Sequence, residues 1–260
     1  MKVSVKYWRS SLAVVMVVMA LIMSTPAVFA DNINPGVLPI NGQIGGLTYG
    51  QWSEKWWQYA FSVTTFAHCP AEPSGQMWFL AGATNRRGIA VRNCIVPSGK
   101  NIMFPVFNAE WSVAEAREQQ ETTHKQSCFI PDLPNGTSDA DLLACATAQA
   151  NQALDEDASL EAKVDGVKLQ NLPNFRAVSP PFTFTTVAEN PFGLCPADGS
   201  CPLTSRAVAD GFWIILTPLS PGMHTVHFAA SVPFPKVNPP ATPFTFTTDA
   251  TYHLMVQPGQ

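Results

Sequence analysis

Apolar residues first recur at helical spacing between residues 48 and 63, where polar residues occupy the intervening positions. A period of three to four residues predicts a helix with one buried face. Thr48, followed three residues later by Gln51, has the pattern of a capping box at a helix start. The segment therefore predicts an amphipathic helix with an aromatic stripe. The stripe consists of Tyr49, Trp52, Trp56, Tyr59 and Val63.

Short apolar runs separated by Gly, Pro and Asn predict β-strands through most of the remaining chain. Pro105 inside one run predicts a sheet edge or a bulge there. Residues 211–217 are apolar on both faces, which predicts a central strand, and Asp165-Gly166 predicts a hairpin turn. The predicted strands cover residues 77–81, 89–96, 101–108, 162–164, 167–169, 181–186, 211–217, 223–230 and 251–256.

Two further helices are predicted near the middle of the chain. Ser112 begins a Ser-x-x-Glu capping pattern, and the Ala-rich segment 138–154 opens with Ser and Asp. These elements predict a helical insertion at about 111–156. The fold class is therefore mainly β: an antiparallel β-sandwich of jelly-roll or immunoglobulin-like type, forming one domain over 48–260. Residues 31–47 are predicted to be an extended lead-in.

The first thirty residues have the pattern of an export signal. Basic residues precede an apolar run from Ser11 to Met23, and small residues at Val28 and Ala30 suit cleavage after Ala30. The apolar run is short for a membrane span, which needs about 20 residues. The sequence thus predicts a secreted or periplasmic protein with no stable membrane span after cleavage.

Six cysteines follow the export segment: Cys69, Cys94, Cys128, Cys145, Cys195 and Cys201. An even number of cysteines outside the cytoplasm favours disulfides, although six cysteines allow 15 pairings. The most economical pairing joins neighbours in the chain, and the pair 128–145 would then link the helical insertion to itself. Zinc sites need closely spaced Cys or His ligands, which this pattern lacks. No metal and no cofactor is predicted.

Charge restricts the class of partner. Removing Lys2, Lys6 and Arg9 with the signal leaves 12 basic against 19 acidic residues, a net charge of −7. Nucleic acids and anionic membranes attract clustered Lys and Arg, so neither is a predicted partner. A glycan or another cell-surface ligand remains compatible with this charge.

Five segments together resemble a family of exported bacterial proteins of unknown function. The resemblance implies a bacterial exported origin and one continuous domain, and it implies no activity. The segments are residues 49–60 (YGQWSEKWWQYA), 75–82 (GQMWFLAG), 164–167 (VDGV), 219–228 (LSPGMHTVHF) and 251–254 (TYHL).

Candidate ligand-binding residues come from three places. Trp57 lies at the margin of the aromatic stripe and could offer an exposed platform to a sugar, although Trp residues on a helix more often fill a core. Glu110, between Asn108 and Trp111, follows a predicted strand, where a rigid scaffold can present polar groups. Arg176 could bind an anion, but a structural ion pair is the simpler interpretation.

Other groups carry weaker signals. His224 and His227 are three residues apart on a predicted strand, so they face opposite sides and cannot act together. Asp210 and Asp249 precede predicted strands and are interpreted as turn residues. No nucleophile motif of the serine hydrolases occurs.

Three functions stay open. The first is a non-enzymatic extracellular binding module, and the second is a structural protein of the cell envelope. The third is a carbohydrate-active hydrolase or lyase using Glu110 with a second acid, because glycosidases need two carboxyl groups.

Overall fold

The computed structural model describes residues 34, 36–66, 69, 75–83, 87–123, 128, 130–133, 136–195, 200–238 and 241–259. Residues Ile33–Gln260 cluster as one compact unit. The predicted export signal and its cleavage site lie outside the described residues. None of the helices in the described part of the chain is long and apolar enough to cross a membrane.

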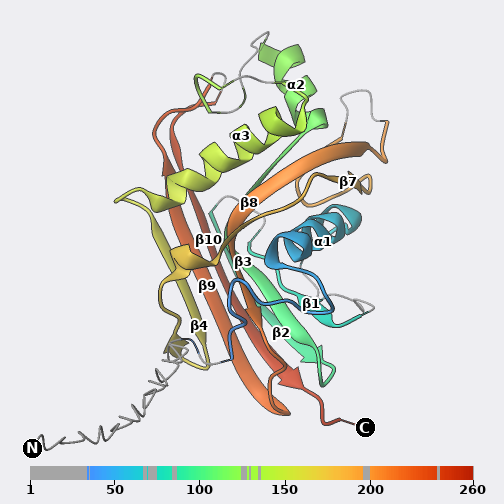
Figure 1. Ribbon diagram of the computed structural model, residues 1–260, viewed down its shortest axis with the longest axis vertical. Coiled ribbons are helices and arrows are strands. Elements are labelled where there is room, and N and C mark those ends of the chain that lie inside the picture. The colour runs from blue at the N-terminus through green and yellow to red at the C-terminus, as the bar shows by residue number, and fades with distance from the viewer. Residues whose placement is uncertain are drawn as a thin grey trace, which may run out of the picture. The chain divides into compact units, whose positions relative to one another are not determined.

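Within the described residues, the strands form two five-stranded sheets (Figure 1). Sheet 1 has the order β1-β3-β8-β6, with β7 also paired to β8, and sheet 2 has the order β2-β10-β9-β4-β5. The strands of sheet 1 are β1 (Met77–Phe79), β3 (Asn101–Ser112), β6 (Arg176–Val178), β7 (Phe182–Thr185) and β8 (Thr204–Leu216). Those of sheet 2 are β2 (Arg87–Val96), β4 (Ser159–Val164), β5 (Val167–Lys168), β9 (Gly222–Phe234) and β10 (Phe244–Val256).

The mainly β, two-sheet prediction is confirmed, but the prediction of a purely antiparallel sandwich is wrong. β1 pairs with β3 in parallel, and β2 pairs with β10 in parallel. The cause is a crossover: β2 follows β1 in the chain but joins the other sheet, so β1 and β3 run in the same direction. Parallel neighbours need such a crossover connection. The mixed sheets do not match a jelly roll or an immunoglobulin domain clearly.

Three α-helices accompany the sheets in the described residues: α1 (Tyr49–Ser62), α2 (Val113–Thr123) and α3 (Asp139–Asn151). All three begin at capping boxes, in which a Ser or Thr side chain and the residue three positions later exchange hydrogen bonds with backbone N–H groups. Such caps satisfy the free N–H groups of the first turn. The three helix starts predicted from these patterns are therefore confirmed.

Sheet 1 is the middle layer of the unit. One face packs on α1 through the cluster that includes Trp56, Met103 and Trp213, and the other face packs on sheet 2 through Phe104, Phe212 and Phe228. Figure 1 shows α1 on one side of β8 and β9, β10 and β4 on the other. β8 is buried on both faces from Ala207 to Leu216, as predicted for a central strand.

Disulfides join the cysteines in the economical pattern: Cys69 with Cys94, Cys128 with Cys145, and Cys195 with Cys201. The second links α3 to the segment before it and lies in a small core with Trp111 and Val208. The helical insertion is thus held to sheet 1 by apolar packing and closed on itself by a covalent bond.

Candidate functional site

The candidate site is a groove along the edge of β3, called here the β3-edge groove. β1 pairs only with Asn101–Met103, and a bulge between Pro105 and Phe107 follows. Pro105 was predicted to mark a bulge or an edge, and the strand has both. From Pro105 to Trp111 every residue of β3 lines the groove, whose volume is about 520 Å³. A groove of this volume can hold a small molecule or a segment of a peptide.

Two aromatic walls enclose the groove. The wall on the α1 side consists of Trp56, Trp57, Phe61 and Phe66, completed by the loop residues Pro191–Leu194. The wall on the side of sheet 2 consists of Phe234, Phe244 and Phe246 with Thr248. Glu115, Glu118 and Gln149 lie on the helical insertion and complete the lining.

Glu110 is the most unusual residue of the groove. It is buried on β3, and its Oε1 atom has no hydrogen-bond partner in the described structure. Burial, and then the nearby carboxyl group of Glu115, raise the pKa of Glu110 well above its ordinary value. The raised pKa favours the protonated form of Glu110, which can both donate and accept a hydrogen bond.

Glu115 has a structural role beside it. Its Oε2 atom accepts hydrogen bonds from the Ser112 backbone N–H at 2.9 Å and from Ser112 Oγ at 2.6 Å, which caps α2. Burial raises the pKa of Glu115, while the bonds from Ser112 and Glu110 oppose that rise. The capping bonds favour the ionised form, so the proton of the pair belongs on Glu110.

Three further buried polar atoms of the lining lack a partner among the described residues: Trp57 Nε1, Asn108 Nδ2 and Trp111 Nε1. All three are donors. Buried polar groups in native proteins are almost always hydrogen-bonded, so an unpartnered group needs an explanation. Four such atoms line this one groove, which makes it the candidate site for a molecule that exchanges hydrogen bonds with them.

The structure brings four of the five sequence-predicted binding residues together: Trp57, Asn108, Glu110 and Trp111 all line the β3-edge groove. Of the two interpretations of Trp57, exposed platform or part of the core, the structure has the second, because only 7% of the residue is accessible. Its ring lies 5.1 Å from that of Trp56 and 5.4 Å from that of Phe192. Trp57 is thus part of a wall rather than an open platform.

Arg176 lies elsewhere, in an ion pair. Its Nε and Nη2 atoms donate to the two carboxyl oxygens of Asp210 at 2.9 and 2.7 Å, and its Nη1 donates to Asn151 at 2.8 Å. Asp210 was interpreted as a turn residue, but it lies inside β8 and is buried. The strand begins at Thr204, seven residues before the predicted start, because Ala207 and Ala209 pack against α1.

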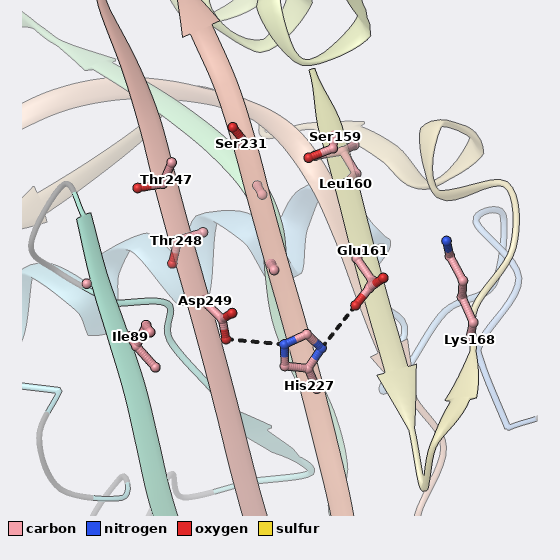
Figure 2. A pocket seen from close by; sticks show the side chains of 13 residues that line it. Ile89, Ser159, Leu160, Glu161, Lys168, His227, Ser231, Thr247, Thr248 and Asp249 are labelled. Carbon is pink, nitrogen blue, oxygen red and sulfur yellow. Dashed lines mark hydrogen bonds and ion pairs between the residues drawn. The ribbon is translucent and has the colours of Figure 1, made fainter. Parts of the chain in front are cut away.

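A second hollow lies on the outer face of sheet 2, and Figure 2 shows His227 between two carboxylates there. His227 Nε2 is 3.2 Å from Asp249 Oδ1, and its Nδ1 is 3.5 Å from Glu161 Oε1. Lys163 also pairs with Glu161, at 2.6 Å. Asp249, interpreted as a turn residue, lies within β10. Among the described residues, no group of three His, Cys, Asp or Glu side chains is placed to hold a metal ion.

Ser220, His224 and Asp165 look like a catalytic triad but have the wrong hydrogen-bond arrangement. His224 Nδ1 is 2.7 Å from Asp165 Oδ2, and Nε2 is 2.9 Å from the Ser220 carbonyl oxygen, closer than the 3.3 Å to Ser220 Oγ. Nε2 lies closer to the Ser220 carbonyl oxygen than to the Ser220 hydroxyl. This position favours a protonated Nε2, which cannot accept the serine proton as a catalytic base does.

We expect Asp165→Asn to lower the pKa of His224. Burial lowers this pKa. The bonds to Asp165 and to the Ser220 carbonyl raise it by more than burial lowers it, so the net shift of the pKa is upward. The contribution of protonated His224 to the stability of the fold is therefore complete below the unfolded-state pKa of about 6.5. It is lost as pH rises through the folded-state pKa. NMR titration of the His224 ring in both proteins checks this. An unchanged midpoint would show that Asp165 does not act on the ring.

The comparisons with known proteins add little. No protein-family model matches the chain, and no curated protein matches it. A solved structure of a cysteine protease inhibitor from Entamoeba histolytica is similar at 10% identity, covering 71% of this chain and 100% of the inhibitor, with a TM-score of 0.18. A similarity of that size supports no statement about fold or function.

Proposed function

We propose that this protein is a non-enzymatic binding module of the cell exterior or periplasm, and that its ligand, a glycan or another surface molecule, occupies the β3-edge groove. The observation that carries the proposal is the set of four buried, unpartnered polar atoms on Trp57, Asn108, Glu110 and Trp111. These atoms expose almost no surface themselves. Small side-chain rotations, which are common on binding, would bring them to a ligand.

The groove selects for ligand chemistry. Three of the four atoms are N–H donors, and the fourth, Glu110 Oε1, is an acceptor, because the protonated Glu110 carboxyl donates its hydrogen to Glu115. The ligand should therefore offer several uncharged acceptors, such as carbonyl or hydroxyl oxygens. The aromatic walls suit apolar faces between those acceptors, because aromatic rings contribute large contact areas at binding sites.

The proposed location rests on covalent structure. All six cysteines are joined in disulfides, which persist outside the reducing cytoplasm. This fits a periplasmic or extracellular protein. Export through the predicted signal at residues 1–30 and membership of the exported bacterial family remain parts of the proposal.

A structural role in the cell envelope is the second candidate. The outer face of sheet 2 exposes a group of apolar side chains, which is unusual on a monomer surface and can mark an association site. The group consists of Ile89, Val91, Ile95, Met223 and Met255. It lies on a different face of the sheet from the β3-edge groove, so the two candidates can be tested separately.

A hydrolase or lyase using Glu110 is the third candidate, and the raised pKa of Glu110 suits a proton donor. Glycosidase carboxyl groups are separated by about 5–10 Å. Glu115 is in hydrogen-bonding contact with Glu110 instead. This contact favours a binding role for Glu110 over an acid–base pair.

Asn108→Ala tests the binding proposal. Purified protein is screened on a glycan array and by octapeptide display, and affinities of the selected ligands are measured by calorimetry. We expect about fivefold weaker binding for Asn108→Ala, because one ligand hydrogen bond is worth about 1 kcal/mol. Asn93→Ala, an exposed position on β2, is the matched control and should bind normally.

Two results would count against the proposal. One is the absence of any ligand in both screens. The other is a ligand whose affinity is the same for Asn108→Ala and for the unaltered protein. Mass spectrometry of the ligand after incubation separates the enzymatic alternative: cleavage that disappears in Glu110→Gln would establish a hydrolase or lyase.

A further inference from the structure

We infer that the ligand of the β3-edge groove is an extended polypeptide segment of a partner protein, which adds to sheet 1 as a strand beside residues 106–111. The inference rests on the proposed function, since it names the class of ligand for the same site. Four features of the groove carry it: an unpaired strand edge, its length, two opposite apolar walls and the sign of its charge.

In the described part of the chain, one edge of β3 has no paired strand beyond Met103, because β1 pairs with β3 only up to that residue. The last bond from the β1 side joins the Leu80 N–H to the Met103 carbonyl oxygen at 2.8 Å. The chain then crosses to sheet 2, where Ala81 N–H donates to the Tyr252 hydroxyl and Ala83 N–H donates to Thr248 Oγ1. Within the described residues, β8 is the only strand paired with β3 beyond Met103.

An edge of this kind offers backbone hydrogen bonds at regular spacing. In an antiparallel pair, alternate residues direct their N–H and C=O groups away from the partner strand. All residues from Pro105 to Trp111 line the groove, so an added strand would meet these outward-directed groups there. Pro105 has no N–H, so the usable edge begins at Val106. Six residues of strand span about 20 Å.

The two walls match the side chains of an added strand. Successive side chains of a strand point to opposite faces of the sheet. On one face of β3 the groove has Trp56 and Trp57 of α1, and on the other it has Phe244 and Phe246 of sheet 2. Phe107 packs at 5.5 Å from Phe246, which places that wall directly against the strand. Apolar residues of a peptide would thus enter both walls.

The charge of the lining further restricts the class of peptide that can bind. The lining contains the carboxylate of Glu115 beside the protonated Glu110, and the described lining residues include no Lys, Arg or His. An acidic peptide would be repelled, whereas a neutral or basic one is attracted toward the α2 end of the groove. A glycan could use the walls and the donors, but it has no repeat that matches the alternating N–H and C=O groups of a strand edge. The groove therefore favours polypeptide.

The test uses the purified oxidised full-length chain. Peptides are selected on it from a random octapeptide display library, and the enriched sequences are synthesised in two forms, one unmodified and one N-methylated at alternate residues. Chitohexaose, xylohexaose and maltohexaose form the glycan arm. Binding is followed by calorimetry, and hydrogen exchange of the backbone amides is followed by NMR.

We expect the enriched peptides to be free of clustered Asp and Glu and to have apolar residues at successive positions, so that both walls are contacted. N-methylation in the edge-facing phase should weaken binding at least tenfold, because it removes the N–H groups that strand pairing requires. Amide exchange should slow at least tenfold within residues 106–111. The exposed amides of β2 serve as the internal reference and should not change.

Other outcomes overturn the inference in distinguishable ways. Binding of an oligosaccharide without any peptide would retain the proposed function and refute the polypeptide class. Peptide binding that leaves exchange in 106–111 unchanged would place the site elsewhere. Amide exchange in residues 106–111 could also slow without any peptide when the protein concentration is raised. That result would show that the edge pairs with a second copy of this chain. No ligand in either arm would refute the proposed function as well.

Discussion

Glu110→Gln is expected to raise the free energy of unfolding at pH 7. Burial and the neighbouring Glu115 raise the pKa of Glu110 in the folded state, whereas the unfolded chain has the ordinary value near 4.3. Between these two values the folded state binds more protons than the unfolded state. Stability therefore falls as pH rises, by about 1.4 kcal/mol per pH unit for one group.

The neutral amide that Glu110→Gln introduces removes this dependence. It matches the shape of the protonated acid, and its NH₂ group can donate to the Glu115 carboxylate that caps α2. Urea unfolding at intervals from pH 4 to pH 8 gives the unfolding free energy of both proteins. We expect the unaltered chain to lose stability above about pH 5 and Glu110→Gln to lose much less.

Glu121→Gln is the matched control, because Glu121 is an exposed residue of α2 and its substitution removes the same charge without a buried partner. Its unfolding profile should follow that of the unaltered protein. The assignment of a neutral Glu110 would be refuted if Glu110→Gln were less stable than the unaltered chain at every pH. A destabilising carboxyl that is retained in a groove is typical of a functional site, where activity is favoured over stability.

Features that depend on nearby residues could be predicted from the sequence. The three capping boxes, the Asp165-Gly166 turn and the bulge at Pro105 each depend on a few adjacent residues, and the structure has all of them. Pairing of neighbouring cysteines has the same local character, because a short loop closes at low entropic cost. Asn108, Glu110 and Trp111 were found together because one strand carries all three.

Features that depend on distant segments could not be predicted in this way. The parallel pairing of β2 with β10 joins residues far apart in the chain, and strand periodicity carries no information about direction. The wall residues Phe192 and Phe246 could not be predicted either, because they reach the groove from segments that are distant in the chain. The Ser-x-x-Glu pattern did predict Glu115 as a cap, but it gave no indication that this carboxyl group would contact Glu110.

The Arg176–Asp210 pair shows how the helical insertion depends on a buried charge. Asp210 is 1% exposed within β8, and the two-pronged contact with Arg176 is supported by Thr147 Oγ1, which donates to Asp210 Oδ2 at 3.0 Å. Arg176 also donates to Asn151 at the end of α3. The pair therefore joins β6 and β8 to the helix that carries Gln149 into the groove.

Arg176→Met is expected to lower the free energy of unfolding by about 3–5 kcal/mol, because it leaves the Asp210 carboxylate buried without its positive partner. For a domain of this size the melting temperature should fall by about 10 °C. The double variant Arg176→Met/Asp210→Leu removes both charges, and it should recover most of that loss, since apolar replacement of a whole buried pair is often neutral. Urea unfolding of the unaltered chain, the two single variants Arg176→Met and Asp210→Leu, and the double variant measures the coupling energy between the two residues. If the double variant were less stable than Arg176→Met alone, the loss would come from packing around Arg176 and not from an uncompensated charge.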